Sequence, residues 1–151
     1  MFTTIQQFEQ VWVSEAELTQ KVLQNLTDES LSRKVAEGRW TLGDIAWHIV
    51  TTISWFMDLF ALDRDIVKPD APAPSSATDI EQTYAGVAQA LLQGIKQTWD
   101  DDTLRVEDDI DGGKHERRRL LLFLIKHQIH HRGQMTVLMH QIGLPVPPVY
   151  G

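Results

Sequence analysis

The chain has 151 residues, of which 42% are hydrophobic and 23% are charged, and its formal net charge is −7. This length and composition predict one globular domain over residues 1–151, and the acidic balance argues against a nucleic-acid or anionic-membrane partner, since both need basic surface. The absence of cysteine excludes disulfides, thiolate metal sites and a cysteine nucleophile. Neither a signal-peptide pattern nor a bilayer-length apolar run is present, so we expect a cytoplasmic protein.

Two amphipathic helices are predicted in the first half of the chain. Apolar residues recur at three-to-four-residue spacing over about residues 3–26, which predicts the first helix. The polar stretch 27–40 is expected to be a connection with one short turn of helix. Thr41 and Asp44 have the spacing of a capping pair, and the long apolar stripe after them predicts the second helix over about 41–61.

A long loop, a third helix and a second loop follow. The segment 63–78 contains three prolines and is predicted to be a surface crossover between helices. Thr78 or Asp79 can cap the third helix, whose apolar residues recur at helical spacing over about 79–99. Residues 100–114 are acidic and contain two adjacent glycines, so we expect a loop with room for a short hairpin.

The fourth helix is predicted over about 116–142, because apolar or histidine residues hold a three-to-four-residue spacing until Gly143. The proline-rich tail 144–151 is expected to lie extended along the helices. Four amphipathic helices with one long crossover, between the second and the third, predict an all-α four-helix bundle.

Three histidines are candidate metal ligands. On a helix His131 lies about 40° around the axis from His127, and both fall within the core-facing arc of aliphatic residues. Their i, i+4 spacing lets the two rings converge on a point about 2 Å from each, as a divalent transition metal requires. His48, on the apolar stripe of the second helix, is the expected third ligand. A core histidine that is merely hydrogen-bonded remains the alternative for each residue taken singly.

Zinc and nickel both accept imidazole, and three protein ligands would leave a position for water or a small-molecule substrate.

Several residues near the three histidines in sequence have two possible roles. Asp44 could orient His48 or accept a proton, or it could only cap its helix. Gln134 could bond a ligand or simply pack, and Gly133 could admit a close neighbouring helix. Arg132 could pair with an acidic residue, and His130 lies at the edge of the core-facing arc.

The aromatic and basic residues are expected to be mainly structural. The five tryptophans are assigned to the core or to dimer contacts, with Trp47 and Trp55 noted because they flank His48 in sequence. The run Arg117 to Arg119 is predicted to be a solvated first turn, with binding of an anionic substrate group as the alternative.

The motif His131-Arg132-Gly133-Gln134, with His127 four residues before it and His48 much earlier, resembles the DinB-like family over nearly the whole chain. The resemblance implies a four-helix bundle with a long crossover, a metal held by three histidines at these positions, and frequent homodimers. Some members of that family transfer a low-molecular-weight thiol, such as bacillithiol, mycothiol or glutathione, onto an electrophile.

Three hypotheses follow from the residues and the resemblance together. The first is a metal-dependent thiol S-transferase or hydrolase that acts on a small molecule, in which His48, His127 and His131 hold Zn²⁺ or Ni²⁺. The second is a non-catalytic dimeric stress-response protein that binds a metal or a ligand. The third is that the histidines are structural only. No spacing in the sequence identifies a general base.

Overall fold

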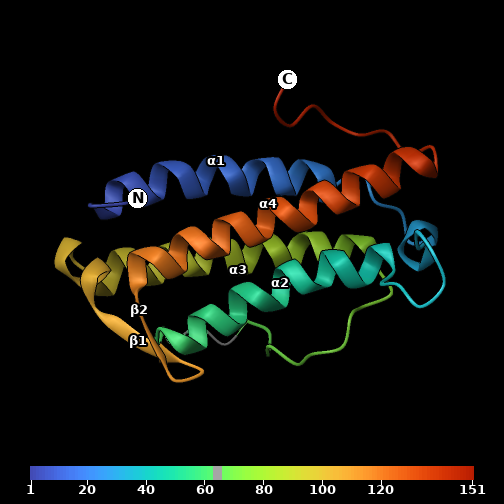
Figure 1. Ribbon diagram of the computed structural model, residues 1–151. Coiled ribbons are helices and arrows are strands. Elements are labelled where there is room, and N and C mark those ends of the chain that lie inside the picture. The colour runs from blue at the N-terminus through green and yellow to red at the C-terminus, as the bar shows by residue number, and fades with distance from the viewer. Residues whose placement is uncertain (63–65) are drawn as a thin grey trace.

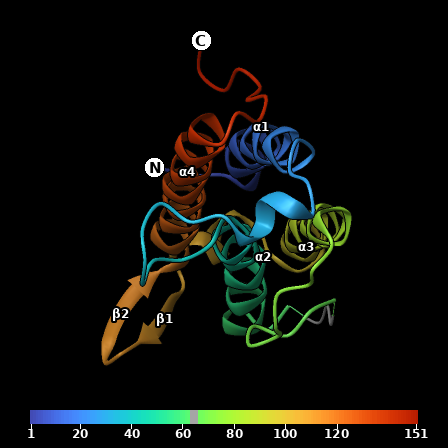
Figure 2. The ribbon, with the colours of Figure 1, turned by 90° about the vertical axis from the view of Figure 1, so that its right-hand side faces the viewer.

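Four long helices lie side by side in the computed structural model, which describes residues 1–62 and 66–151 (Figure 1). They are α1 (Ile5–Leu23), α2 (Leu42–Leu59), α3 (Ala77–Thr98) and α4 (Arg117–Gln141). Viewed from one end, the four helices occupy the corners of a bundle (Figure 2), in which α2 packs on α3 and α4, and α1 also packs on both. The predicted all-α four-helix bundle is confirmed.

Polar side chains set the helix starts. Thr41 and Asp44 form a complete capping box at α2, because the Thr41 hydroxyl accepts from the Asp44 amide and the Asp44 carboxylate accepts from the Thr41 amide. At α3 the predicted caps Thr78 and Asp79 are wrong. Ser76 is the N-cap residue, and its hydroxyl accepts from the Asp79 amide. Ser76, Thr78 and Asp79 are all residue types that can cap a helix, and Ser76 is the one with extended backbone directly before the helix.

The first two helices are shorter than predicted at their ends. Helix α1 ends at Leu23, whereas Leu26 is buried outside it, in the connection to the next helix. Helix α2 ends at Leu59, and Ala61 has the positive φ of 52° that stops a helix. Burial continues past each helix end, so the apolar spacing alone could not locate it.

The long crossover returns the chain along the bundle, so that α2 and α3 run in the same direction (Figure 1). Of the predicted loop 63–78, residues 63–65 lie outside the described residues, and the last two positions belong to α3. The crossover is tied to α2 where the Trp47 indole donates to the Ala71 carbonyl, at 2.7 Å. This contact holds the loop against the helix that carries His48.

Short elements fill both other connections. One turn of 3₁₀ helix, η1 (Glu29–Ser32), follows α1 as predicted. A second, η2 (Asp101–Arg105), precedes the hairpin of β1 (Glu107–Ile110) and β2 (Gly113–Glu116), whose register pairs Glu107 with Glu116. Only two strands form, so sheet structure is minor among the described residues.

The prediction of a solvated basic run at the start of α4 is wrong for its first two members. The Arg117 guanidinium pairs with Asp108 at 2.9 Å and lies 4.8 Å from the centre of the Trp99 ring. Arg118 makes two hydrogen bonds to Glu116. These arginines fasten the hairpin to α4, because their carboxylate partners come from the two strands.

The core is built from the apolar faces of all four helices, and its largest fully buried side chains include Trp12, Tyr84, Phe8 and Phe56. Trp12 and Trp47 are buried as predicted, but Trp55 is 42% exposed. The tail is extended, and Asn25 donates to the Pro145 carbonyl, which places the tail against the end of α1. In residues 1–62 and 66–151, no helix combines the length and apolar character needed to cross a membrane.

Candidate metal centre

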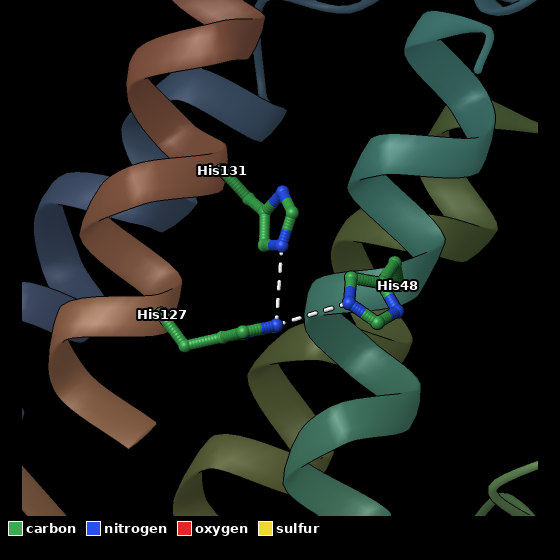
Figure 3. A group of neighbouring side chains, drawn as sticks. All are labelled: His48, His127 and His131. Atoms are coloured by element: carbon green, nitrogen blue, oxygen red, sulfur yellow. Dashed lines mark hydrogen bonds between the residues drawn. The ribbon is translucent and has the colours of Figure 1, made fainter. Parts of the chain in front are cut away.

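The structure brings the three predicted histidines together between α2 and α4. Figure 3 shows the rings of His127 and His131, from α4, pointing toward the ring of His48, from α2. The Nε2 atom of His127 lies 3.0 Å from Nε2 of His48 and 3.1 Å from Nε2 of His131. Within the described residues these three side chains form a group that could hold a metal ion.

Helix geometry explains this convergence. His127 and His131 are one turn apart, so their ring centres are only 4.4 Å from each other. His48 comes from the middle of α2, next to the buried Ile49, and α2 packs directly against α4. Each ring is therefore half-buried at the edge of the core, and none is turned out to solvent.

Gln134 fixes the tautomer of His131. The amide oxygen of Gln134 lies 2.7 Å from Nδ1 of His131, so Nδ1 must carry the proton that it donates. The neutral ring then has its lone pair on Nε2, the atom that faces the other two histidines. Ligating histidines are usually held in this way, by a hydrogen bond from the second ring nitrogen. Of the two roles considered for Gln134, a bond to a candidate ligand is the one observed.

The environment favours the neutral form of all three rings. The pKa of His127 is lowered to about 4, mainly by burial and also because a charge on this ring would be repelled by protonated His131, His48 or His130. Burial and His131 lower the pKa of His48. Burial also lowers the pKa of His131, although its hydrogen bond to Gln134 acts in the opposite direction. Neutral imidazole is the form that binds a metal.

A divalent cation fits this donor set. Two nitrogen ligands of a tetrahedral zinc ion are about 3.3 Å apart, given bond lengths of about 2.0–2.1 Å. The two Nε2 separations of 3.0 and 3.1 Å are close to that value. Without a cation, His127 has no described partner for its buried Nδ1, and its Nε2 faces the lone pair of His131. The residues present therefore suit a metal better than a set of imidazole hydrogen bonds.

Trp40 is a feature of the site that the sequence did not indicate. Its ring centre lies 4.8 Å from that of His48 and 6.1 Å from that of His131, and it is nearly parallel to the latter ring. The residue is 51% exposed, so it covers the histidines from the solvent side rather than belonging to the core. The polar segment around it gave no signal, because only the turn into α2 brings Trp40 over the rings.

The structure distinguishes between the roles considered for the other residues near the three histidines. Asp44 serves the capping box, and the structure describes no hydrogen bond from it to a histidine. Arg132 does pair with an acidic residue, Glu15, at 2.8 Å. The close helix approach at Gly133 is wrong, since a Cβ atom there would meet nothing within 4 Å. The ring centre of His130 lies 4.9 Å from that of His131.

Pockets border the histidines from more than one direction. A pocket of about 790 Å³ lies beside His131 and is lined partly by Arg39, Trp40, Gly133 and Val137. Another, of about 320 Å³, borders His48 and His127 and has largely aromatic and aliphatic walls, including Trp55, Phe56 and Phe123. Small molecules can therefore reach the histidine cluster from either pocket.

Fold and site together define a four-helix-bundle protein with a candidate three-histidine metal centre. The chain belongs to the DinB family, whose model matches residues 1–151. Uncharacterized protein YrdA of Bacillus subtilis (strain 168) is 44% identical over 151 residues, which cover all of this chain and 90% of that protein.

Solved structures agree with this assignment. A DinB-like protein from Bacillus cereus ATCC 10987 is similar with a TM-score of 0.94 and 46% identity, over 99% of this chain and 100% of that chain. The DinB-like protein YjoA from Bacillus subtilis has a TM-score of 0.76 at 22% identity, over 95% of this chain and 96% of that chain. The second likeness shows the fold alone.

Proposed function

We propose that the protein is a metal-dependent enzyme in which His48, His127 and His131 hold Zn²⁺ or Ni²⁺ and a small molecule reacts beside them. The observation that carries this proposal is the convergence of three Nε2 atoms from two helices, with His127 Nε2 only 3.0 and 3.1 Å from the other two. Three imidazoles leave a coordination position open, which is typical of catalytic rather than closed structural sites.

The protein's own residues prepare the site. Gln134 holds His131 with its Nε2 lone pair toward the cluster, and burial keeps the three rings in the unprotonated form. Trp40 limits the access of water to the rings. When bound, a divalent cation would lower the pKa of a thiol or a water molecule and so make a nucleophile available at neutral pH.

The reaction that we favour is transfer of a low-molecular-weight thiol onto an electrophile. In this reaction the thiol sulfur forms a bond to carbon, the leaving group departs with its electron pair, and the thiol proton passes to solvent. Two reactants need two binding regions, and two of the pockets that border the histidines, beside His131 and beside His127, meet this need. A hydrolase would use water in place of the thiol, and the second pocket would then have no separate role.

The test begins with elemental analysis of untagged, purified protein. We expect about one zinc or nickel ion per chain, loss of this metal in His131→Ala, and its retention in His140→Ala, which changes an exposed histidine on the same helix. Loss of glutathione or bacillithiol with 1-chloro-2,4-dinitrobenzene is then measured. Metal without turnover of thiols or esters would favour the non-catalytic alternative, and full metal content in His131→Ala would reject the site itself.

The proposal includes a cytoplasmic homodimer, as the family resemblance implies. Light scattering on the purified protein should give twice the chain mass. A monomer at all concentrations would contradict this part of the proposal without affecting the metal site.

A further inference from the structure

Gly133 occupies a position where the fold does not need a glycine. It lies within α4, a helix of 25 residues, and glycine inside a helix is less favourable than alanine. A close neighbour would justify it, as at Gly43, where a Cβ atom would lie 3.1 Å from Leu31. At Gly133 nothing lies within 4 Å of that position, and its φ is not positive. Neither packing nor backbone conformation therefore explains the residue.

The space left open at Gly133 belongs to the pocket beside His131. This pocket, of about 790 Å³, falls within the range of small-molecule sites, roughly 300–1,000 Å³. Val35, Trp40 and Val137 supply apolar side chains to its wall, and all three are exposed. A side chain added at Gly133 would project into this volume, so the glycine keeps the pocket open next to a candidate metal ligand.

Arg39 gives the same pocket a positive charge. Among the described residues, no carboxylate pairs with its guanidinium, whereas Arg117, Arg118 and Arg132 each have one. The chain carries a net charge of −7, so acidic partners are abundant elsewhere. A guanidinium that lines an apolar pocket is suited to a carboxylate or another oxyanion, which it can bind through two parallel hydrogen bonds.

We propose that this pocket binds an organic anion with an apolar body, and that Gly133 and Arg39 determine its specificity. The apolar body packs against Trp40 and Val137, and the acidic group pairs with Arg39. The inference rests on the proposed function in one respect, since it names the class of small molecule held beside His131. Binding itself needs only the pocket, so it can be measured with or without a metal.

Two fluorescent dyes separate shape from charge. The probes are 8-anilinonaphthalene-1-sulfonate, an aromatic anion, and N-phenyl-1-naphthylamine, which has the same rings without the sulfonate. Both are titrated into the full-length protein, loaded with Zn²⁺ and after treatment with EDTA. We expect saturable binding of one dye molecule per chain in either state. Absence of saturable binding of the anionic dye to the wild-type protein would overturn the proposal.

The variants assign the binding to this pocket. Gly133→Leu should lower the affinity for both dyes at least about tenfold, because the leucine side chain occupies part of the pocket. Leucine has a higher helix propensity than glycine, so the variant should remain stably folded. Gln141→Leu, at an exposed position on the same helix outside the pocket lining, should leave both affinities unchanged. Unaltered binding of the anionic dye by a folded Gly133→Leu protein would reject the inference.

Arg39→Gln decides the question of charge, and it does so even if Gly133→Leu fails to fold. Arg39 is exposed in the connection before α2, so its replacement should not disturb the core. We expect about tenfold weaker binding of the anionic dye and unchanged binding of the neutral dye. Equal effects on both dyes would contradict an anion site. Dye binding with no metal in the purified protein would keep this inference and reject the proposed function.

Discussion

Gln134 is the residue on which the orientation of His131 depends. Its amide oxygen accepts from Nδ1 of His131 at 2.7 Å. Gln134→Leu should therefore weaken metal binding by about 10- to 100-fold, the usual effect of losing such a partner. Competition against a chromophoric chelator measures this, with Gln141→Leu as the matched control on the same helix. Equal affinities in both variants would show that the hydrogen bond does not support a ligand.

The lowered pKa of His127 predicts how the stability of the metal-free protein depends on pH. Its folded pKa is about 4 and its ordinary value is 6.5, so the unfolded chain takes up a proton first as the pH falls. The stabilisation of the folded protein that arises from this pKa difference is fully present above about pH 6.5. It is lost as the pH falls from there to about pH 4. The urea concentration at the unfolding midpoint should decrease when the pH is lowered from 7.5 to 5. It should decrease less steeply in His127→Gln. Identical slopes would contradict the assigned burial.

At the scale of single residues, the sequence predicted the histidines but not their surroundings. His127 and His131 share a helix face by spacing alone, and His48 stood out as a histidine within another apolar stripe. Trp40 and the open space at Gly133 depend on how a connecting segment passes over α4. No local pattern encodes that path, so these features appear only in the folded chain.

At the scale of the elements, the capping box of α2 supports the helix that presents His48. Asp44→Ala removes the carboxylate that accepts from the Thr41 amide, and it should cost about 1 kcal/mol. Asp58 is exposed in the last turn of the same helix, where its carboxylate faces the negative end of the helix dipole. Asp58→Ala should therefore not lower the free energy of unfolding. Thermal unfolding compares them. Equal melting temperatures would mean that the cap is not stabilising.

All four helices were predictable because apolar residues recur at helical spacing in each, although the buried face of α4 also includes Gln128 and Arg132. The positions of the helix ends were less predictable. Apolar residues such as Leu26 and Leu62 are buried in the turns after α1 and α2, so the apolar spacing extends beyond the helical backbone. The hairpin before α4 was expected only as a possibility, since its strands hold four residues each and its stability depends on arginines from α4.

At the scale of the whole molecule, one buried ion pair joins α1, α4 and the C-terminal tail. Arg132 is 2% exposed and donates to Glu15, to the Thr19 hydroxyl and to the Tyr150 hydroxyl. Tyr150 in turn donates to Glu15. The sequence left an acidic partner for Arg132 as a possibility and did not identify it, because Glu15 lies more than a hundred positions away on another helix.

Removing this arginine should be costly. Arg132→Met removes the cationic partner of Glu15 and leaves this carboxylate poorly solvated. Removing one partner of a buried ion pair lowers the free energy of unfolding by about 3–5 kcal/mol. Arg118→Met breaks a more solvent-exposed pair with Glu116 and should lower the free energy of unfolding much less than Arg132→Met does. Urea unfolding of both variants gives the comparison. A smaller loss for Arg132→Met than for Arg118→Met would show that the buried pair does not hold the bundle together.

The sequence predicted the four-helix bundle from the number of helices and one proline-rich crossover. It did not predict the path that the crossover takes. Only the fold shows that it is tied to α2 through Trp47 and that α2 and α4 are neighbours. That adjacency is what turns histidines 79 positions apart in sequence into one cluster.

X-ray absorption spectroscopy of the zinc-loaded protein tests the central claim most directly. We predict three imidazole nitrogens at about 2.0–2.1 Å from the metal, falling to two in His48→Ala. A shell of oxygen ligands alone, or an imidazole count that does not change in His48→Ala, would contradict the account.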